Sequence, residues 1–171
     1  WCAASTHPSE EILCAKTHLL LKKIHANILT IIIPRHIERT ETISNKLSNL
    51  NLKVTLYSNF EQINNETDVL LIDAYGEANK FYNISKCVFL GKSLIKSMAK
   101  DSGQNPIEPS RLGCKIFHGP FVSNFAEIYK YLKSLDVTKE VLSPEELNQS
   151  LVEELQNNKK KNEQIIQKIE N

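Results

Sequence analysis

The stretch Ile28-Leu29-Thr30-Ile31-Ile32-Ile33-Pro34 is a continuous apolar run, rich in β-branched residues and ended by proline. Such a run is typical of a strand buried on both faces, as in a parallel sheet with helices on each side. Proline ends the run because its nitrogen carries no hydrogen to donate to a neighbouring strand. The stretch therefore predicts a buried strand whose carboxyl end delivers Arg35 and His36.

The segments around this run alternate between strand and helix patterns. Further short apolar runs lie at residues 1–4, 53–57, 69–73, 86–90 and 114–117. Helical patterns lie at residues 12–24, 37–50, 81–84, 124–135 and 143–155, with another helix start near 105, and we expect loops at 59–67 and 91–103. This alternation predicts an α/β fold, namely a Rossmann-like open, mostly parallel sheet with helices on both faces.

The composition limits the class of protein. With 171 residues the chain can form one domain, which we expect at 1–158, followed by a charged helical tail at 159–171. A net charge of +1 predicts no nucleic-acid partner. The four cysteines have no metal-ligand spacing, so we expect reduced core residues in a cytosolic compartment and no metal site. No apolar run approaches the roughly 20 residues that cross a membrane. The chain starts on an apolar run without methionine, and we expect it to be part of a longer protein.

Polar clusters follow the predicted strands or open the predicted helices. They lie at residues 5–11, 34–39, 75–77, 91–93 and 104–108. Ligands of open α/β sheets bind outside the carboxyl ends of the strands. The clusters therefore predict a ligand site on that rim of the sheet.

Residues 102–110, Ser-Gly-Gln-Asn-Pro-Ile-Glu-Pro-Ser, form a glycine loop that runs into a helix start. Asn105 suits the N-cap, Pro106 the first helical position and Glu108 the third. A carboxylate at that position either caps the helix or accepts a hydrogen bond from a ligand hydroxyl. The local pattern leaves both alternatives open.

Taken together, the clusters resemble the C-terminal half of 3-deoxy-D-manno-octulosonic acid (Kdo) transferases. That family carries Ser-Thr-His-Pro-Gly-Glu-Glu, Pro-Arg-His-Pro-Glu-Arg, Asp-Thr-Met-Gly-Glu, Gly-Gly-Ser-Leu and Gly-Gly-His-Asn-Pro-Leu-Glu segments. The matching segments here are Ser5-Thr6-His7-Pro8-Ser9-Glu10-Glu11, Pro34-Arg35-His36-Ile37-Glu38-Arg39, Asp73-Ala74-Tyr75-Gly76-Glu77, Gly91-Lys92-Ser93-Leu94 and Ser102-Gly103-Gln104-Asn105-Pro106-Ile107-Glu108. Each motif alone is weak, but the ordered set is specific.

The resemblance implies the donor-binding half of a two-domain GT-B glycosyltransferase of lipopolysaccharide biosynthesis. Such an enzyme transfers Kdo from CMP-Kdo to a lipid A precursor, with inversion and without a metal or further cofactor. It works at the cytoplasmic face of the inner membrane of a Gram-negative bacterium. The general base, the membrane anchor and most acceptor contacts are expected in an N-terminal domain. We therefore expect this chain alone to bind CMP weakly and to transfer nothing.

The resemblance also implies which residues bind the nucleotide. The matched positions are Pro34, Arg35, Tyr75, Gly76, Glu77, Asn105, Pro106, Ile107 and Glu108. Arg35 suits the phosphate and Glu108 the ribose hydroxyls, and amides near Gly91 and Asn105 are expected to stabilise the departing phosphate. Candidate contacts to donor or acceptor are Ser5, Thr6, His7, Gly91, Ser93 and Gln104. We interpret Glu10 and Glu11 as capping or hydrogen-bonding support.

The chain departs from the family pattern at four matched positions. Three family glycines are replaced, by Ser9, Lys92 and Ser102, and each replacement restricts the backbone conformations that the turn can adopt. Gln104 replaces a histidine and has no titratable side chain. Two other functions stay open. One is a non-catalytic nucleotide-binding or partner-docking domain of the same fold. The other is half of a nucleotide-sugar epimerase, which would prefer a uridine diphosphate ligand.

Overall fold

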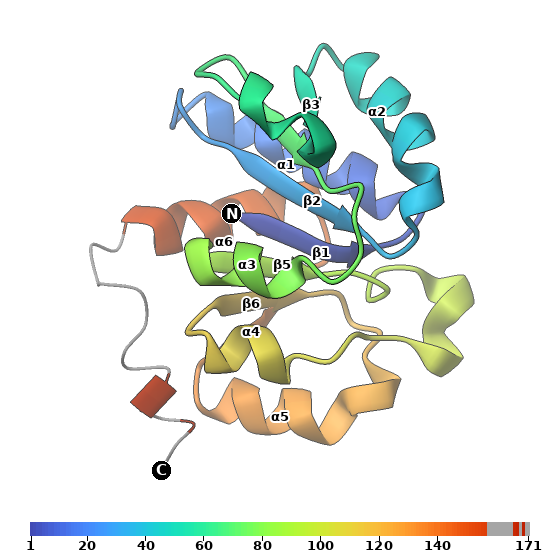
Figure 1. The fold of residues 1–171 in the computed structure, drawn as a ribbon. Helices are drawn as coiled ribbons and strands as arrows, with labels where there is room; N and C mark the ends of the chain where they lie inside the picture. Colours follow the sequence, from blue (N-terminus) through green and yellow to red (C-terminus); the bar gives the residue numbers. More distant parts are fainter. Residues whose placement is uncertain (157–165, 168, 170–171) are drawn as a thin grey trace.

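A computed structural model describes residues 1–156, 166–167 and 169 (Figure 1). Its seven strands form one sheet in the order β3-β4-β2-β1-β5-β6-β7, and every neighbouring pair is parallel. The strands are β1 Cys2–Thr6, β2 Thr30–Pro34, β3 Val54–Leu56, β4 Val69–Leu71, β5 Cys87–Leu90, β6 Lys115–His118 and β7 Thr138–Glu140. All their carboxyl ends therefore meet at one rim.

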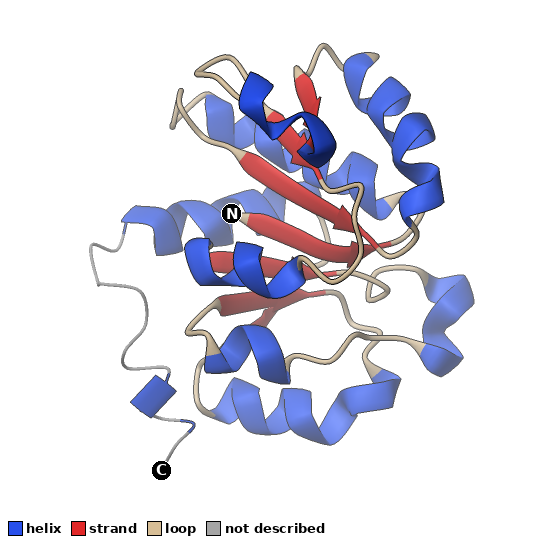
Figure 2. Ribbon diagram, in the orientation of Figure 1, coloured by secondary structure: helices blue, strands red, loops and turns tan. Residues whose placement is uncertain are grey.

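Helices cover both faces of the sheet (Figure 2). One layer contains α1 Glu10–Lys22, α2 Thr40–Ser48 and α6 Pro144–Gln156, and the other contains α3 Ala78–Ile84, α4 Ile107–Arg111 and α5 Ala126–Ser134. Short 3-10 helices lie at Ile37–Arg39, Tyr57–Gln62, Lys96–Asp101 and Ser123–Phe125. The predicted fold class is confirmed.

The central strands alternate between two hydrophobic clusters. On β2, Ile32 packs toward the cluster shared with α1, α2 and α6, whereas Ile31 and Ile33 pack toward the cluster shared with α3, α4 and α5. All five residues of β2 are buried. This is the burial that the apolar run predicts, since only a strand covered on both faces benefits from apolar side chains at every position. The four cysteines are also buried, and they form no disulfide with one another, as expected.

Local sequence explains where several elements begin and end. At α6, the Ser143 hydroxyl accepts from the amide of Glu146 (3.2 Å), and the Glu146 carboxylate accepts from the amide of Leu142 (2.7 Å). Reciprocal bonds of this kind satisfy amides that a helix start leaves unpaired. At α4, the predicted cap is displaced by one residue, because the helix begins at Ile107 and its N-cap is Pro106. Asn105, one position earlier, accepts through Oδ1 from the amide of Ile107 (3.0 Å).

Several boundaries differ from the sequence-based expectation. Strands β3 and β4 are shorter than residues 53–57 and 69–73, and the helix expected at 37–50 begins with a 3-10 turn before α2. The expected loop at 59–67 contains part of the 3-10 helix Tyr57–Gln62, and the expected loop at 91–103 contains the whole 3-10 helix Lys96–Asp101. Strand β7 was not predicted. The boundary expected at residue 158 and most of the expected tail lie outside the described residues; within the tail, Ile169 packs against the cluster of α3, α4 and α5. Among the described helices, none is both long and apolar enough to cross a membrane.

Candidate functional site at the carboxyl rim

The centre of the rim lies between β1 and β5. The chain leaves β1 through α1 toward β2 on one side, and it leaves β5 toward β6 on the other. Two loops therefore diverge here, residues 7–9 after β1 and residues 91–106 after β5. Such a reversal of strand order is the place where open α/β sheets bind their ligands.

Glu10 joins these two loops from a position that is 1% exposed. Its carboxylate accepts hydrogen bonds from four backbone amides, those of Lys92 (2.8 Å), His7 and Ser93 (both 3.0 Å) and Leu94 (3.2 Å). Burial raises the pKa of Glu10, and the four amides oppose that shift. Glu10 therefore provides hydrogen-bonding support, as interpreted from the sequence.

These bonds correct one expectation about the phosphate. The amide of Gly91 donates to the carbonyl of Ala4 (2.9 Å), and the next three amides donate to Glu10. The amides near Gly91 are thus engaged inside the protein, because a buried carboxylate already occupies the position at which they converge. Near Asn105, the amide of Ile107 is likewise taken by the Asn105 side chain.

These loops contain four positions that are glycine in this chain or in the resembled family. A Cβ on Gly91 would lie 2.5 Å from the carbonyl oxygen of Ser5 and 2.7 Å from Thr6 Cα, so only glycine allows the two loops to approach so closely. Ser9 and Lys92, which replace glycines of the resembled family, keep left-handed conformations with φ of 79° and 54°. Ser102 has φ of −101°, which any residue adopts.

Ser93, a candidate contact, is fully buried and serves the scaffold. Its hydroxyl donates to the carbonyl of Leu90 (2.6 Å) and accepts from the amide of Gly119 (2.9 Å). The backbone carbonyl of Gln104, another candidate, accepts a hydrogen bond from the hydroxyl of Tyr129 (2.9 Å). The bond from Gly119 joins the loops after β5 and β6, and the bond from Tyr129 joins the loop after β5 to α5.

Arg35 lies exposed directly after β2, where its amide donates to the carbonyl of Thr6 (3.0 Å). Its guanidinium has no hydrogen-bond or ion-pair partner in the part of the chain that the structure describes. The nearby Arg39 differs, because it binds the Glu11 carboxylate through two hydrogen bonds of 2.9 and 3.2 Å. Arg35 is thus available to a ligand, and Glu11 has the supporting role expected for it.

The turn after β4 is built around Gly76, whose φ of 79° favours glycine. The exposed Tyr75 donates its hydroxyl to the Glu38 carboxylate (3.2 Å), which links this turn to the loop after β2. Glu77 pairs with Lys80 (2.5 Å) and accepts from the hydroxyl of Tyr57 (3.3 Å). The hydrogen bond from Lys80 lowers the pKa of Glu77.

Glu108 is exposed in the first turn of α4, and its carboxylate makes no hydrogen bond to the residues described. Helix α4 packs beside α3, which follows the Tyr75–Glu77 turn. Burial raises the pKa of Tyr82 on α3, and the charge of the Glu108 carboxylate adds to that shift. The absence of a capping bond leaves Glu108 able to accept from a ligand.

Thr6 and His7 lie at the end of β1, between the loops that carry Arg35 and Gly91. Their exposed fractions are 0% and 6%. Neither Thr6 Oγ1 nor His7 Nε2 has a hydrogen-bond partner among the described residues. Sequence reasoning named both as candidates, and the burial of these unpaired atoms is visible only in the structure.

The rim thus gathers most of the predicted residues into two adjoining groups. One group follows β2 and β4 and contains Pro34, Arg35, Tyr75, Gly76 and Glu77, and it is extended by Asn105, Pro106, Ile107 and Glu108 at the start of α4, which packs against α3. The other surrounds the ends of β1 and β5 and contains Ser5, Thr6, His7, Gly91 and Ser93. Within the described residues, no group of three or more His, Cys, Asp or Glu side chains is placed to hold a metal ion.

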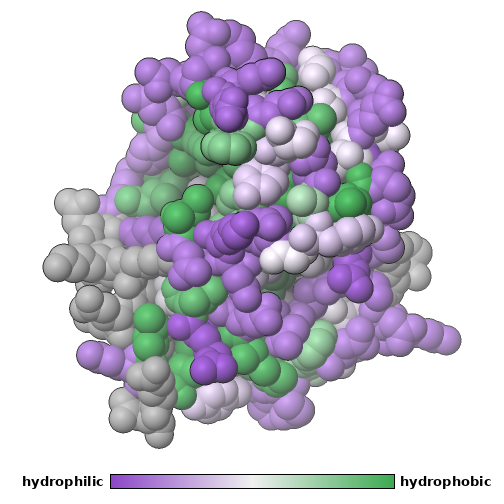
Figure 3. Space-filling model, in the orientation of Figure 1, coloured by the Kyte–Doolittle hydropathy of each residue, from purple (hydrophilic) through white to green (hydrophobic). Residues whose placement is uncertain are grey.

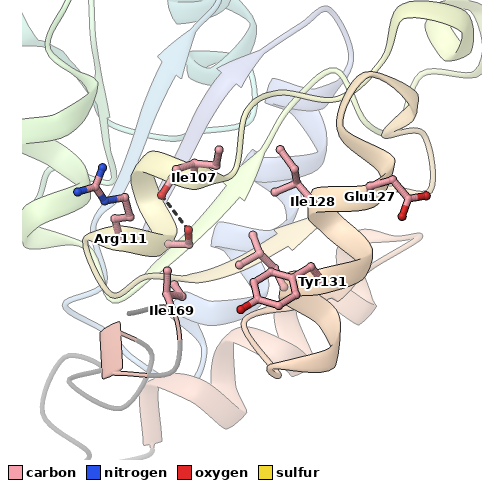
Figure 4. A pocket seen from close by; sticks show the side chains of 8 residues that line it. Ile107, Arg111, Glu127, Ile128, Tyr131 and Ile169 are labelled. Atoms are coloured by element: carbon pink, nitrogen blue, oxygen red, sulfur yellow. Dashed lines mark hydrogen bonds between the residues drawn. The ribbon is translucent and has the colours of Figure 1, made fainter. Parts of the chain in front are cut away.

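An apolar pocket of about 410 Å³ adjoins the first group but lies outside the rim. Ile107 and Arg111 of α4, Ile128 and Tyr131 of α5, and Ile169 line it (Figure 4). Apolar surface gathers over this part of the molecule in Figure 3. Apolar side chains make up most of the lining, so the pocket suits an apolar group better than a nucleotide.

The parallel sheet and the reversal of strand order at β1 and β5 define a Rossmann-like α/β domain. The chain is, more particularly, a homologue of Kdo transferases, and its structure is similar to that of a solved C-terminal CMP-Kdo binding domain. It is 33% identical over 165 residues to the 3-deoxy-D-manno-octulosonic acid transferase of Haemophilus influenzae, covering 96% of this chain and 38% of that protein. The predicted resemblance is confirmed.

Other relatives agree with this assignment. The transferase of Aquifex aeolicus is 26% identical, with 88% of this chain and 40% of the relative covered. The crystal structure of the C-terminal CMP-Kdo binding domain of WaaA from Acinetobacter baumannii matches with a TM-score of 0.82 and 26% identity, covering 99% of this chain and 86% of that domain. No family model matches the chain. The chain spans less than half the length of these transferases.

Proposed function

We propose that the chain is the donor-binding domain of a glycosyltransferase that transfers Kdo from CMP-Kdo to a lipid A precursor in lipopolysaccharide biosynthesis. The observation that carries this proposal is the match to a solved CMP-Kdo binding domain over 99% of the chain. The activity of the whole enzyme is part of the proposal, because the chain spans 38% of its Haemophilus relative. The lipid acceptor and a location at the cytoplasmic face of the bacterial inner membrane are also part of the proposal.

The proposal assigns the nucleotide to the first group of rim residues. Arg35 offers an unpaired, permanently charged guanidinium whose flat fork of donors suits a phosphate. Glu108 offers free carboxylate oxygens to the ribose hydroxyls from the first turn of α4. The Tyr75-Gly76-Glu77 turn and Asn105-Pro106-Ile107 complete the nucleotide site, and the open space around Gly76 allows a close approach to the backbone.

The proposed reaction is displacement at the anomeric carbon of Kdo with inversion. A base outside this chain removes the proton of the acceptor hydroxyl, the hydroxyl oxygen attacks, and the bond to the phosphate oxygen breaks so that CMP leaves. Arg35 stabilises the negative charge that builds on the departing phosphate, which supports a metal-independent reaction. Glu10 and Glu11 do not act as the base, since four amides and Arg39 occupy their carboxylates.

Calorimetry with CMP, UMP and UDP tests the nucleotide assignment, and an assay with CMP-Kdo and a lipid A precursor tests the catalytic half. We expect weak binding of CMP, little binding of the uridine nucleotides and no transfer by the chain alone. Preference for UDP would favour the epimerase architecture instead. Transfer by the isolated chain would show that the base and the acceptor site lie within it.

A further inference from the structure

The end of β1 contains two buried polar atoms whose hydrogen-bonding capacity is unused. Thr6 Oγ1 and His7 Nε2 have no partner among the residues that the structure describes, although the two residues are 0% and 6% exposed. An unpaired buried polar group costs about 1–3 kcal/mol. A protein keeps such groups most readily where a ligand pairs with them, and this strand end lies at the centre of the rim.

The backbone around these atoms is also unusual. Ser5 has φ of 54°, and the pairing between β1 and β2 shifts register between Ala4 and Thr6, so that Thr6 lies opposite Pro34. Irregularities at strand ends re-aim side chains and are frequent beside active sites. Here the irregularity places Thr6 and His7 between the Arg35 loop and the Gly91-Lys92 loop.

The surrounding charge favours an anionic ligand. His7 lies within electrostatic reach of His36, Lys92, Arg39 and Arg35, and its ring is 5.8 Å from that of His36. Arg39 is neutralised by Glu11, and His36 lies 3.6 Å from the Glu38 carboxylate. Lys92 and Arg35 form no ion pair within the described residues, so two positive charges remain for a ligand.

The donor of the proposed function carries two anions. In the glycosyl phosphate of a 2-keto sugar acid, the carboxylate and the phosphate are attached to the same carbon. A protein that binds both therefore needs two anion-binding groups side by side. Arg35 and the Thr6-His7 pair lie on adjacent backbone segments, because the amide of Arg35 donates to the carbonyl of Thr6 at 3.0 Å.

We propose that Thr6 and His7, with the ammonium group of Lys92, bind the carboxylate of the donor sugar while Arg35 binds its phosphate. Thr6 donates its hydroxyl hydrogen and neutral His7 donates one ring N–H, which together suit a carboxylate. The amides of residues 92–94 cannot take this role, since Glu10 occupies them. Lys92 adds a charge that a glycine at this position would not supply. This inference rests on the proposed function and extends it to recognition of the sugar acid.

Titration of CMP and of CMP-Kdo against matched variants tests the subsite. Thr6→Val and His7→Gln should each weaken CMP-Kdo about tenfold, the equivalent of one hydrogen bond to a charged group, and leave CMP affinity unchanged. Thr6→Ser keeps the hydroxyl and should bind CMP-Kdo like the unmodified chain. Thr138→Val removes a buried hydroxyl on β7, three strands away, and should change neither affinity.

Melting curves identify any variant that fails to fold. If Thr6→Val does not fold, the CMP-Kdo affinity of His7→Gln still tests the subsite. Equal affinities of the folded variants for CMP-Kdo would overturn the subsite. An equal loss for CMP and CMP-Kdo would also overturn it, because these residues would then bind the phosphate. If the unmodified chain binds neither compound, the proposed function fails; if it binds both and only the variants show no difference, the inference alone fails.

Discussion

The Glu10 carboxylate accepts a hydrogen bond of 2.8 Å from the backbone amide of Lys92, which lies 82 residues later in the chain. The contact joins the start of α1 to the loop after β5 at the point where the strand order reverses. Three further amides share the same carboxylate. The shape of the rim therefore depends on a charge that is buried inside the protein, and this charge never reaches the ligand.

Replacement of Glu10 should destabilise the fold. Glu10→Gln leaves one acceptor oxygen and places an NH₂ group against amide donors, so we expect a loss of about 2–3 kcal/mol in the free energy of unfolding. Urea denaturation measures this loss. Glu41→Gln, on the exposed face of the first turn of α2, is the control and should stay within about 0.5 kcal/mol. A Glu10 variant as stable as the control would show that the four amides have adequate partners without it.

The two serines that replace family glycines should respond differently to the reverse substitution. Ser9 has φ of 79° and makes no capping bond, so Ser9→Gly removes strain and should stabilise the chain by about 0.5–1 kcal/mol after the entropic cost of glycine. Ser102 has φ of −101°, and its hydroxyl donates to the carbonyl of Ala99 (2.9 Å). Ser102→Gly should therefore lower stability by about 1 kcal/mol. Thermal melts that rank the two variants in the opposite order would contradict the assigned backbone conformations.

Much of the fold could be predicted from local sequence, because strand and helix patterns depend on neighbouring residues. The apolar run at residues 28–34 predicted β2, and Asn105 and Pro106 predicted the start of α4 to within one residue. Strand β7 escaped prediction because two of its three residues, Lys139 and Glu140, are exposed at the sheet edge and carry charges. An edge strand of this kind has no apolar alternation to reveal it.

The sequence predicted which residues belong to the candidate site better than it predicted the hydrogen-bond partners of those residues. Matched motifs identified Arg35 and Glu108, and the structure shows both free for a ligand within the described chain. No local pattern could reveal that Glu10 occupies the amides after Gly91, since bonds between residues more than 80 positions apart form only through the fold. The same holds for the pair between Glu11 and Arg39.

Protonation of His7 should make stability depend on pH. Burial, followed by the positive charges of His36 and Lys92, lowers the pKa of His7 from 6.5 to about 4. Between these values the unfolded chain binds a proton that the folded chain does not. The stability supplied by neutral His7 is therefore present above pH 6.5 and is lost as the pH falls toward 4, by a few kcal/mol at most, on the order of 1.4 kcal/mol per pH unit.

His7→Gln removes this titration and should flatten the acid limb of a stability curve measured by urea denaturation from pH 7 to pH 4. Burial also lowers the pKa of His18, which contributes a slope of the same sign to both proteins. The difference between the two curves therefore isolates His7. Parallel curves would mean that His7 accepts its proton equally well in the folded and unfolded chains.

Arg35 and Glu108 should affect different parts of the nucleotide. If Arg35 binds the phosphate, Arg35→Ala should weaken CMP by roughly 1.5–3 kcal/mol, about tenfold to a hundredfold, and spare cytidine, which has no phosphate. If Glu108 binds the ribose, Glu108→Gln should weaken CMP and cytidine alike. A Glu108 that only capped α4 would instead lower stability by about 0.5–2 kcal/mol and leave both affinities unchanged. Titration of both ligands against both variants, with melting curves alongside, separates these roles, because only a residue that contacts the nucleotide can change affinity without changing the melting temperature.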